Sequence, residues 1–173
     1  MISSKLKYYF LQRKVKKLQK SEQLCTTVAK NKKIVSVGIL TEEKFREKFD
    51  LRQMTAEMFH IKNPKIYSFR AYNKELEKSF KHFSEKDFNW KGEITETSFQ
   101  SFLNEPFDLL ICYFSEGNIM LKYAAQVSNA TFKVGFTSIN TNLFDLNIAV
   151  KLEEVDQFFF ESRKYLTTLG KLV

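Results

Sequence analysis

Few residues in this sequence have the types and spacings that catalysis or metal binding requires. The two histidines, His60 and His82, form neither an H-x-x-x-H nor an H-E-x-x-H pattern, so they predict no metal site. We expect each histidine at a helix end or in a loop. Cys112 lies within an apolar segment and Cys25 is far from it, which predicts two reduced, structural thiols.

The remaining nucleophiles and carboxylates lack partners that would activate them. Ser98 and Ser101 do not belong to a G-x-S-x-G motif, so the sequence gives no basis for a hydrolase triad. Glu153, Glu154 and Asp156 precede a predicted helix, whose N-terminus attracts negative charge. The sequence therefore favours a non-enzymatic protein with no catalytic residue, metal or cofactor.

A phosphate-binding loop would identify a nucleotide-binding protein, and its usual forms are missing from the sequence. Neither G-x-G-x-x-G nor G-x-x-x-x-G-K-[ST] occurs in the chain. The turn after the first predicted strand reads GILTEEKF, with Glu42 and Glu43 where a phosphate would be bound. Because these carboxylates would repel the anion, standard dinucleotide or nucleoside triphosphate binding is not expected.

The positive charge is concentrated at the N-terminus. The chain of 173 residues has a formal net charge of +8. Residues 1–33 contain ten basic side chains and one acidic side chain and so carry +9, whereas the rest of the chain carries −1. Such a block predicts an arm that binds a polyanion. Its basic residues, all candidate nucleic-acid contacts, are Lys5, Lys7, Arg13, Lys14, Lys16, Lys17, Lys20, Lys30, Lys32 and Lys33.

Residues 2–21 contain no glycine or proline and predict an amphipathic helix. Tyr8, Leu11, Val15 and Leu18 fall on one side of it, and cationic residues occupy the opposite side. Docking of the apolar side on the rest of the fold would explain that side without any function. It does not explain why the opposite side has no acids to pair with its lysines.

A later stretch, residues 82–94, interleaves aromatic rings with basic residues. Its aromatic residues are Phe83, Phe88 and Trp90, and the lysines are Lys81, Lys86 and Lys91. Exposed rings beside lysines can stack on nucleic-acid bases. Buried rings would instead attach this irregular segment to the core. The sequence favours burial and leaves stacking open.

Strand-like and helix-like segments alternate from residue 34 onwards. Buried strands are predicted at residues 34–40, 65–72, 107–114, 132–136 and 144–150. Helices are predicted at residues 41–59, with Thr41 as N-cap, and at 73–80, 117–130 and 155–169. This alternation predicts an α/β fold, a single three-layer Rossmann-like domain with a mainly parallel sheet. We assign residues 1–33 to the basic N-terminal helix and its connection, and residues 34–173 to the α/β domain.

The apolar segments are too short for the membrane. The longest apolar run, residues 107–114, cannot span a bilayer, and lysines interrupt the N-terminal segment where a signal peptide would be continuous. The sequence therefore predicts a cytoplasmic protein.

Three segments resemble an uncharacterised protein family. WKGEI (90–94), FDLLICYF (107–114) and ATFKVGF (130–136), with the basic N-terminal helix, are similar to short flavobacterial-type proteins known only as a domain of unknown function. This resemblance covers most of the chain and implies no activity. Residues 107–136 also resemble one strand–helix–strand unit of heptosyltransferase-like sugar transferases. The chain lacks room for their second, nucleotide-sugar-binding domain, so a complete transferase of that type is not expected.

These features predict a protein that binds RNA or a ribonucleoprotein, such as the ribosome, by shape and backbone. The main phosphate contacts would be Arg13, Lys14, Lys16, Lys17 and Lys20. One alternative is a shortened Rossmann-like domain that binds a nucleotide or sugar around Thr41 and Ser115 to Asn118. Another is a peripheral adaptor on an anionic membrane surface. The N-terminal helix is also a candidate contact for a protein partner.

Overall fold

One parallel sheet of six strands organises the fold. The computed structural model describes residues 2–21, 32–75, 81–139 and 142–172, and the strand order is β3-β2-β1-β4-β5-β6. The strands are β1 (Val37–Glu42), β2 (Lys65–Phe69), β3 (His82–Phe83), β4 (Leu109–Tyr113), β5 (Phe132–Phe136) and β6 (Leu146–Ile148). The helices are α1 (Ile2–Ser21), α2 (Glu43–Lys48), α3 (Leu51–Phe59), α4 (Thr97–Asn104), α5 (Ile119–Val127) and α6 (Val155–Thr168).

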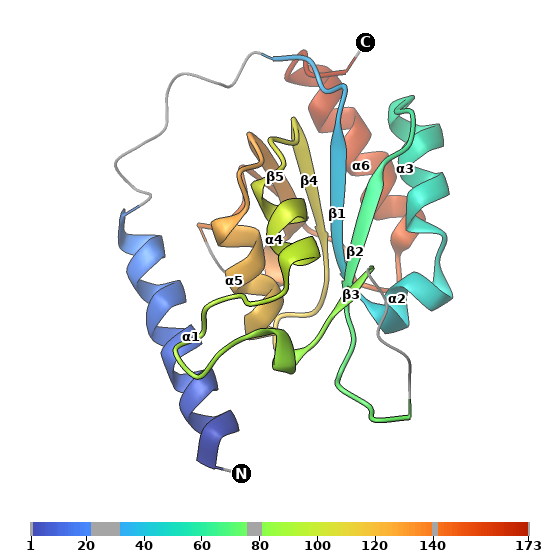
Figure 1. Cartoon of the computed structure of the whole chain (residues 1–173). Helices are drawn as coiled ribbons and strands as arrows, with labels where there is room; N and C mark the ends of the chain where they lie inside the picture. The colour runs from blue at the N-terminus through green and yellow to red at the C-terminus, as the bar shows by residue number, and fades with distance from the viewer. Residues whose placement is uncertain (1, 22–31, 76–80, 140–141, 173) are drawn as a thin grey trace.

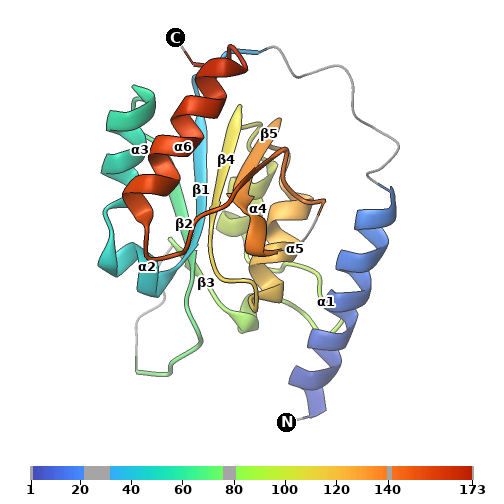
Figure 2. The same ribbon diagram turned by 180° about the vertical axis from the view of Figure 1, so that it is seen from behind.

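Helices cover both faces of the sheet and give three layers (Figure 1). Helices α2, α3 and α6 lie on one face, and α4 and α5 lie on the other, as the view from behind also shows (Figure 2). The chain moves outward from β1 to β3, returns to β4 in the centre, and moves outward again to β6. This strand order is the Rossmann order. The predicted three-layer, Rossmann-like domain is therefore confirmed, and every strand pair in it is parallel.

Aromatic rings fill the core on both faces of the sheet. All five residues of β4 are buried, as expected for a central parallel strand covered on both sides. On one face Phe83 stacks on Phe99 of α4, with ring centroids 3.9 Å apart. On the other face Phe136 of β5 stacks on Phe158 of α6 at 4.5 Å. Phenylalanine, of which the chain has 18, thus joins the sheet to both helical layers.

The predicted single helix over residues 41–59 is wrong in two respects. Strand β1 continues through Thr41 to Glu42, so Glu42, and not Thr41, is the N-cap of α2. The helix is also interrupted after Lys48, because Phe49 adopts an extended conformation. The Asp50 carboxylate then accepts a hydrogen bond from the Gln53 amide and begins α3 as a new helix.

Besides two 3₁₀ helices in the described part of the chain, η2 (Glu85–Asp87) and η3 (Thr137–Ile139), one α-helix and one strand were not predicted. Helix α4 begins where the Glu96 side chain accepts a hydrogen bond from the Phe99 amide, and it buries Phe99, Phe102 and Leu103 at helical spacing. Strand β3 is only two residues long and places His82 in the sheet, not in a loop. The predicted helix over residues 73–80 lies partly outside the described residues, which omit 76–80.

Candidate nucleic-acid interface

Helix α1 is docked on the domain and lies along α5, on the side of α5 away from the sheet (Figure 1). Leu11 is fully buried and Val15 nearly so, as the apolar stripe predicted. The Gln126 side chain of α5 donates a hydrogen bond to the Val15 carbonyl (3.2 Å). Gly92 packs so closely that a Cβ there would lie 3.0 Å from Cδ2 of Leu11. Leu18, at the end of the predicted stripe, is partly buried, whereas Tyr8, at its start, is exposed.

Two cations of α1 hold the helix against the segment that follows β3. The ammonium of Lys7 donates a hydrogen bond to the carbonyl of Glu85 (2.7 Å). That of Lys14 donates to the carbonyl of Gly92 (3.3 Å) and lies 5.6 Å from the centroid of the Tyr123 ring. Both lysines face the same side of the helix as Leu11, and both are partly buried. Their charge contributes to docking as well as to the surface potential.

Four other predicted contacts of α1 face solvent: Lys5, Arg13, Lys16 and Lys17. None of the four forms an ion pair with a carboxylate in the described part of the chain, and α1 itself contains no acidic residue. The guanidinium of Arg13 lies 5.8 Å from the centroid of the Tyr9 ring, on the same exposed face. Lys20 belongs to α1, but its side chain lies outside the described part. We call Lys5, Tyr9, Arg13, Lys16 and Lys17 the cationic face.

The other predicted cations lie in the connection between α1 and the sheet. The Lys32 ammonium forms an ion pair with Asp108 (2.7 Å), and Lys33 donates a hydrogen bond to the carbonyl of Leu172 (3.1 Å). Both lysines therefore join the connection to the body of the domain. Lys30 lies outside the described residues.

The aromatic segment after β3 divides into buried and exposed rings. Phe83 and Phe88 are buried in the core, as the sequence favoured. Trp90, two residues further, is 53% exposed and packs edge-on against Phe10 of α1, with ring centroids 6.0 Å apart. Phe10 in turn contacts the ring of Tyr9 at 5.9 Å. An exposed aromatic group therefore borders the cationic face.

The crevice at the carboxyl ends of β1 and β4 is where a Rossmann-like fold usually binds a nucleotide. Glu42, Ser115 and Asn118 line a cavity of about 310 Å³ there, and Tyr8 of α1 also lines it. The Glu42 carboxylate accepts hydrogen bonds from the amide (2.7 Å) and hydroxyl (2.5 Å) of Ser115, while the Thr41 hydroxyl donates to a backbone carbonyl. The Asn118 side chain caps α5. These donors serve the protein itself, and the carboxylate disfavours an anionic ligand.

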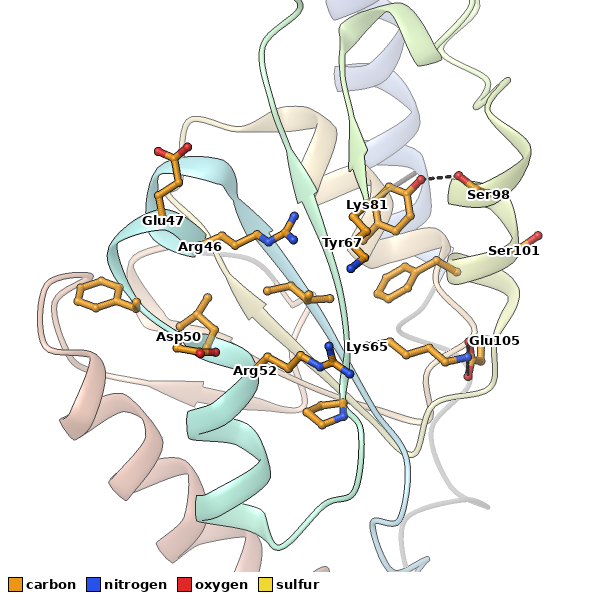
Figure 3. Close-up of a pocket in the computed structure, with 15 residues that line it drawn as sticks. Arg46, Glu47, Asp50, Arg52, Lys65, Tyr67, Lys81, Ser98, Ser101 and Glu105 are labelled. Carbon is orange, nitrogen blue, oxygen red and sulfur yellow. Dashed lines mark hydrogen bonds and ion pairs between the residues drawn. The ribbon is translucent and has the colours of Figure 1, made fainter. Parts of the chain in front are cut away.

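A cavity of about 780 Å³ lies beside β2 between α3 and α4 (Figure 3). Its described lining balances four basic residues against three acidic ones. Lys65 forms an ion pair with both oxygens of Glu105 at 2.8 Å, and the hydroxyls of Tyr67 and Ser98 are 2.6 Å apart. The lining therefore carries a net charge of only +1, with Lys65 and Glu105 already paired, which gives it little preference for an anionic or a cationic ligand.

His82 and Ser68 form the pair that most resembles a catalytic arrangement, with Ser68 Oγ 2.7 Å from His82 Nδ1. Ser68 is fully buried within β2, so it cannot reach a substrate. Nε2 of His82 faces the guanidinium of Arg46 at 3.1 Å. Burial, and then the charges of Arg46, Arg70 and Lys81, lower the pKa of His82 to about 4. The imidazole is therefore neutral at pH 7 and has a structural role.

The lowered pKa of His82 predicts a loss of stability in mild acid. The unfolded chain binds a proton at this histidine near pH 6.5, and the folded chain only near pH 4. Stability is therefore present above pH 6.5 and falls as the pH drops towards 4, by about 2 kcal/mol at pH 4.5. Urea unfolding of H82Q should be less sensitive to pH in this window. Equal losses in the variant and the wild type would contradict this assignment.

The remaining candidates for chemistry are structural in the described part of the chain. Burial raises the pKa of the Cys112 thiol to about 12, which makes the thiol unreactive at pH 7. Cys25 lies outside the described residues. His60 is the C-cap of α3, and Asp156 lies in the first turn of α6, as predicted. The described residues contain no cluster of His, Cys, Asp or Glu side chains arranged to hold a metal ion. No described helix has both the length and the apolar character needed to cross a membrane.

The sheet order and the covering helices define a Rossmann-like α/β protein with a cationic helix docked on its outside. The chain belongs to DUF6913, a family of unknown function, whose model matches residues 7–169. This match agrees with the resemblance of the sequence to an uncharacterised family. No curated protein and no solved structure matches the chain.

Proposed function

We propose that this protein binds RNA, free or within a ribonucleoprotein, through the cationic face of α1, and that it is not an enzyme. One observation carries the proposal. The apolar side of α1 is buried against the domain, yet the helix exposes Lys5, Arg13, Lys16 and Lys17 with no acidic residue among them. A surface that served only solubility would mix both signs of charge.

The docked helix suits the geometry of a nucleic-acid backbone. At 1.5 Å per residue, the segment from Lys5 to Lys17 extends over about 18 Å, which matches several consecutive phosphates. Because Leu11 and Val15 fix the helix on α5, the backbone that carries the cations needs little ordering when they bind. Release of counterions from the phosphates would then supply the free energy of binding.

Two other ligands fit the surface less well. A membrane helix needs a continuous apolar face. Among the described side chains of α1, the exposed large apolar residues are Leu6, Tyr8 and Tyr9, all in its first half. A nucleotide at the crevice beside β1 and β4 would meet the carboxylate of Glu42. A role in binding RNA is also consistent with the cytoplasmic location that the sequence predicts.

The test is a fluorescence-anisotropy titration of a labelled RNA with wild type and with the triple variant R13Q/K16Q/K17Q. From about 50 to 200 mM salt, wild-type affinity should fall steeply. The variant should bind roughly 10- to 100-fold more weakly at low salt, and its log–log salt slope should be smaller by about 2. Circular dichroism should show the same folded content in both proteins, because the three side chains are exposed.

A matched control is R52Q/K62Q/K151Q, which removes the same charge from exposed positions outside α1. This control variant should keep most of the wild-type affinity for RNA. If both triple variants lose affinity equally, the binding reflects net charge and the assignment to α1 is wrong. If wild type binds no RNA at low salt, the proposed function is wrong. Binding to anionic vesicles without RNA binding would identify a membrane adaptor instead.

A further inference from the structure

Trp90 and Tyr9, the aromatic residue of the cationic face, form an exposed aromatic surface that the charge argument does not use. Trp90 is 53% exposed and Tyr9 is 52% exposed, and the ring of Phe10 lies edge-on between them. Cations accompany both rings. The Arg13 guanidinium lies 5.8 Å from the Tyr9 centroid, and the Lys91 ammonium lies 5.2 Å from the Trp90 centroid. Exposed rings of this size next to cations are the usual means of holding unpaired bases.

The turn that carries Trp90 is held rigidly against α1. The side chain of Asn89 accepts a hydrogen bond from the amide of Glu93 (2.9 Å) and donates one to its carboxylate (2.6 Å). Gly92, with φ +70°, lies against α1, where Lys14 donates a hydrogen bond to its carbonyl. The indole is therefore presented at a fixed position, and stacking on it costs little ordering of the protein. The one carboxylate of this turn, that of Glu93, is engaged by Asn89.

A ring that served only to cover the core would be buried like Phe88, which is two residues earlier in the same segment and 2% exposed. Trp90 instead contacts Phe10 of α1 in a T-shaped arrangement and leaves about half of its surface in water. We infer that this surface takes single-stranded RNA, with bases stacked on Trp90 and Tyr9 and with phosphates on the cationic face. The inference rests on the proposed function and narrows it to unpaired nucleotides. Duplex RNA, whose bases are already stacked, would gain only the phosphate contacts.

The only tryptophan of the chain is Trp90, so its intrinsic fluorescence reports directly on this surface. Titration with an oligoadenylate of about 12 nucleotides should quench the indole emission, because a stacked base contacts the ring. An RNA duplex with the same number of phosphates should cause little quenching and should bind more weakly. The W90A variant should lose roughly 5- to 100-fold in affinity for the oligoadenylate. Its salt slope should match that of wild type, because no charge is removed.

The control variant is Y165A. Tyr165 is an exposed ring on α6 with the Lys164 ammonium 5.7 Å from its centroid, so it resembles Trp90 but lies outside the proposed surface. Its removal should leave the affinity unchanged. The W90F variant keeps a ring against Phe10 and should retain part of the affinity, which separates stacking from any effect on folding.

The two proposals fail in different ways. Suppose that the R13Q/K16Q/K17Q variant loses RNA binding, while wild type binds single-stranded and duplex RNA equally well and without quenching. The role of the cationic face would then be supported, and the stacking inference would be wrong. Unchanged affinity of W90A for the oligoadenylate would also overturn the stacking inference. If neither RNA binds to the wild type, the proposed function itself is wrong.

Discussion

Replacement of Asp108 by alanine is expected to lower the free energy of unfolding by about 3 kcal/mol. Asp108 is 4% exposed and stands just before β4. One of its carboxylate oxygens accepts hydrogen bonds from the amide of Val35 (3.0 Å) and from the amide and hydroxyl of Ser36 (both 2.9 Å). The other oxygen pairs with Lys32. Without the carboxylate, these donors lose a charged acceptor at the start of β1.

The balance of effects on Asp108 is visible in its acidity. Burial alone would raise the pKa of this carboxyl, but the hydrogen bonds from Lys32, Val35 and Ser36 outweigh burial and hold the pKa below its ordinary value. The ionised form is therefore the form that stabilises the fold. D108N, which keeps the shape and an acceptor oxygen, should lose less stability than D108A.

Urea unfolding followed by circular dichroism at pH 7 would measure these differences. Asp156 provides the control, because it is exposed in the first turn of α6. D156A should cost less than about 1 kcal/mol, through the helix dipole alone. If D108A were no less stable than D156A, Asp108 would not be an important link between the N-terminal connection and the sheet.

The predicted fold depended on patterns that are local in the sequence. The β-branched and apolar run that includes Ile39, and the fully apolar run of β4, are buried on both faces of the sheet, so their strand character is visible without the tertiary structure. The apolar stripe of α1 likewise identified Leu11 and Val15 as buried. Long segments with a clear period of burial were therefore predicted, although several of their ends were shifted, whereas α4, with only eight residues, was missed.

The residues that define the candidate interface depended on contacts far apart in the sequence. Lys7 and Lys14 lie on the Leu11 side of the helix, which a helical projection indicates, but their acceptors are both 78 residues away. The Lys32 side chain is 65% exposed and still pairs with Asp108. The same projection places Lys16 and Lys17 away from the Leu11 side, and both face solvent. No local pattern shows which acceptors Lys7, Lys14 and Lys32 reach. The sequence located the charge, and the tertiary structure decides which cations remain available.

The same reason explains why the exposure of Trp90 was not predicted. Phe88 and Trp90 occur in an irregular segment with no strand or helix period, so their positions in the sequence do not indicate which ring is buried. Phe88 contacts Phe83, Phe99 and Tyr123 in the core. Among the described rings Trp90 contacts only that of Phe10, in a T-shaped arrangement, because docking of α1 closes over Gly92 and not over the indole.

Replacement of Gly135 by alanine is expected to cost about 3 kcal/mol of stability, because β5 and the Phe144 ring are in close contact there. A Cβ at Gly135 would lie 2.6 Å from Cδ2 of Phe144 and still closer to Cε2 and Cζ. The ring cannot easily move away, because it is 94% buried and its edge faces Phe114 at a centroid distance of 6.4 Å. The added methyl group must therefore displace either the ring or the strand.

The double variant G135A/F144A tests this explanation directly. F144A alone should cost about 3 kcal/mol by leaving a cavity. In the double variant the added methyl group occupies part of that cavity. The total loss of stability should therefore be smaller than the sum of the two single losses by about 1 kcal/mol or more, a typical coupling for residues in contact. G117A is the control, since nothing lies within 4 Å of a Cβ at Gly117, and it should change stability by less than about 0.5 kcal/mol. Additive losses in the double variant would show that Phe144 is not what makes glycine necessary at position 135.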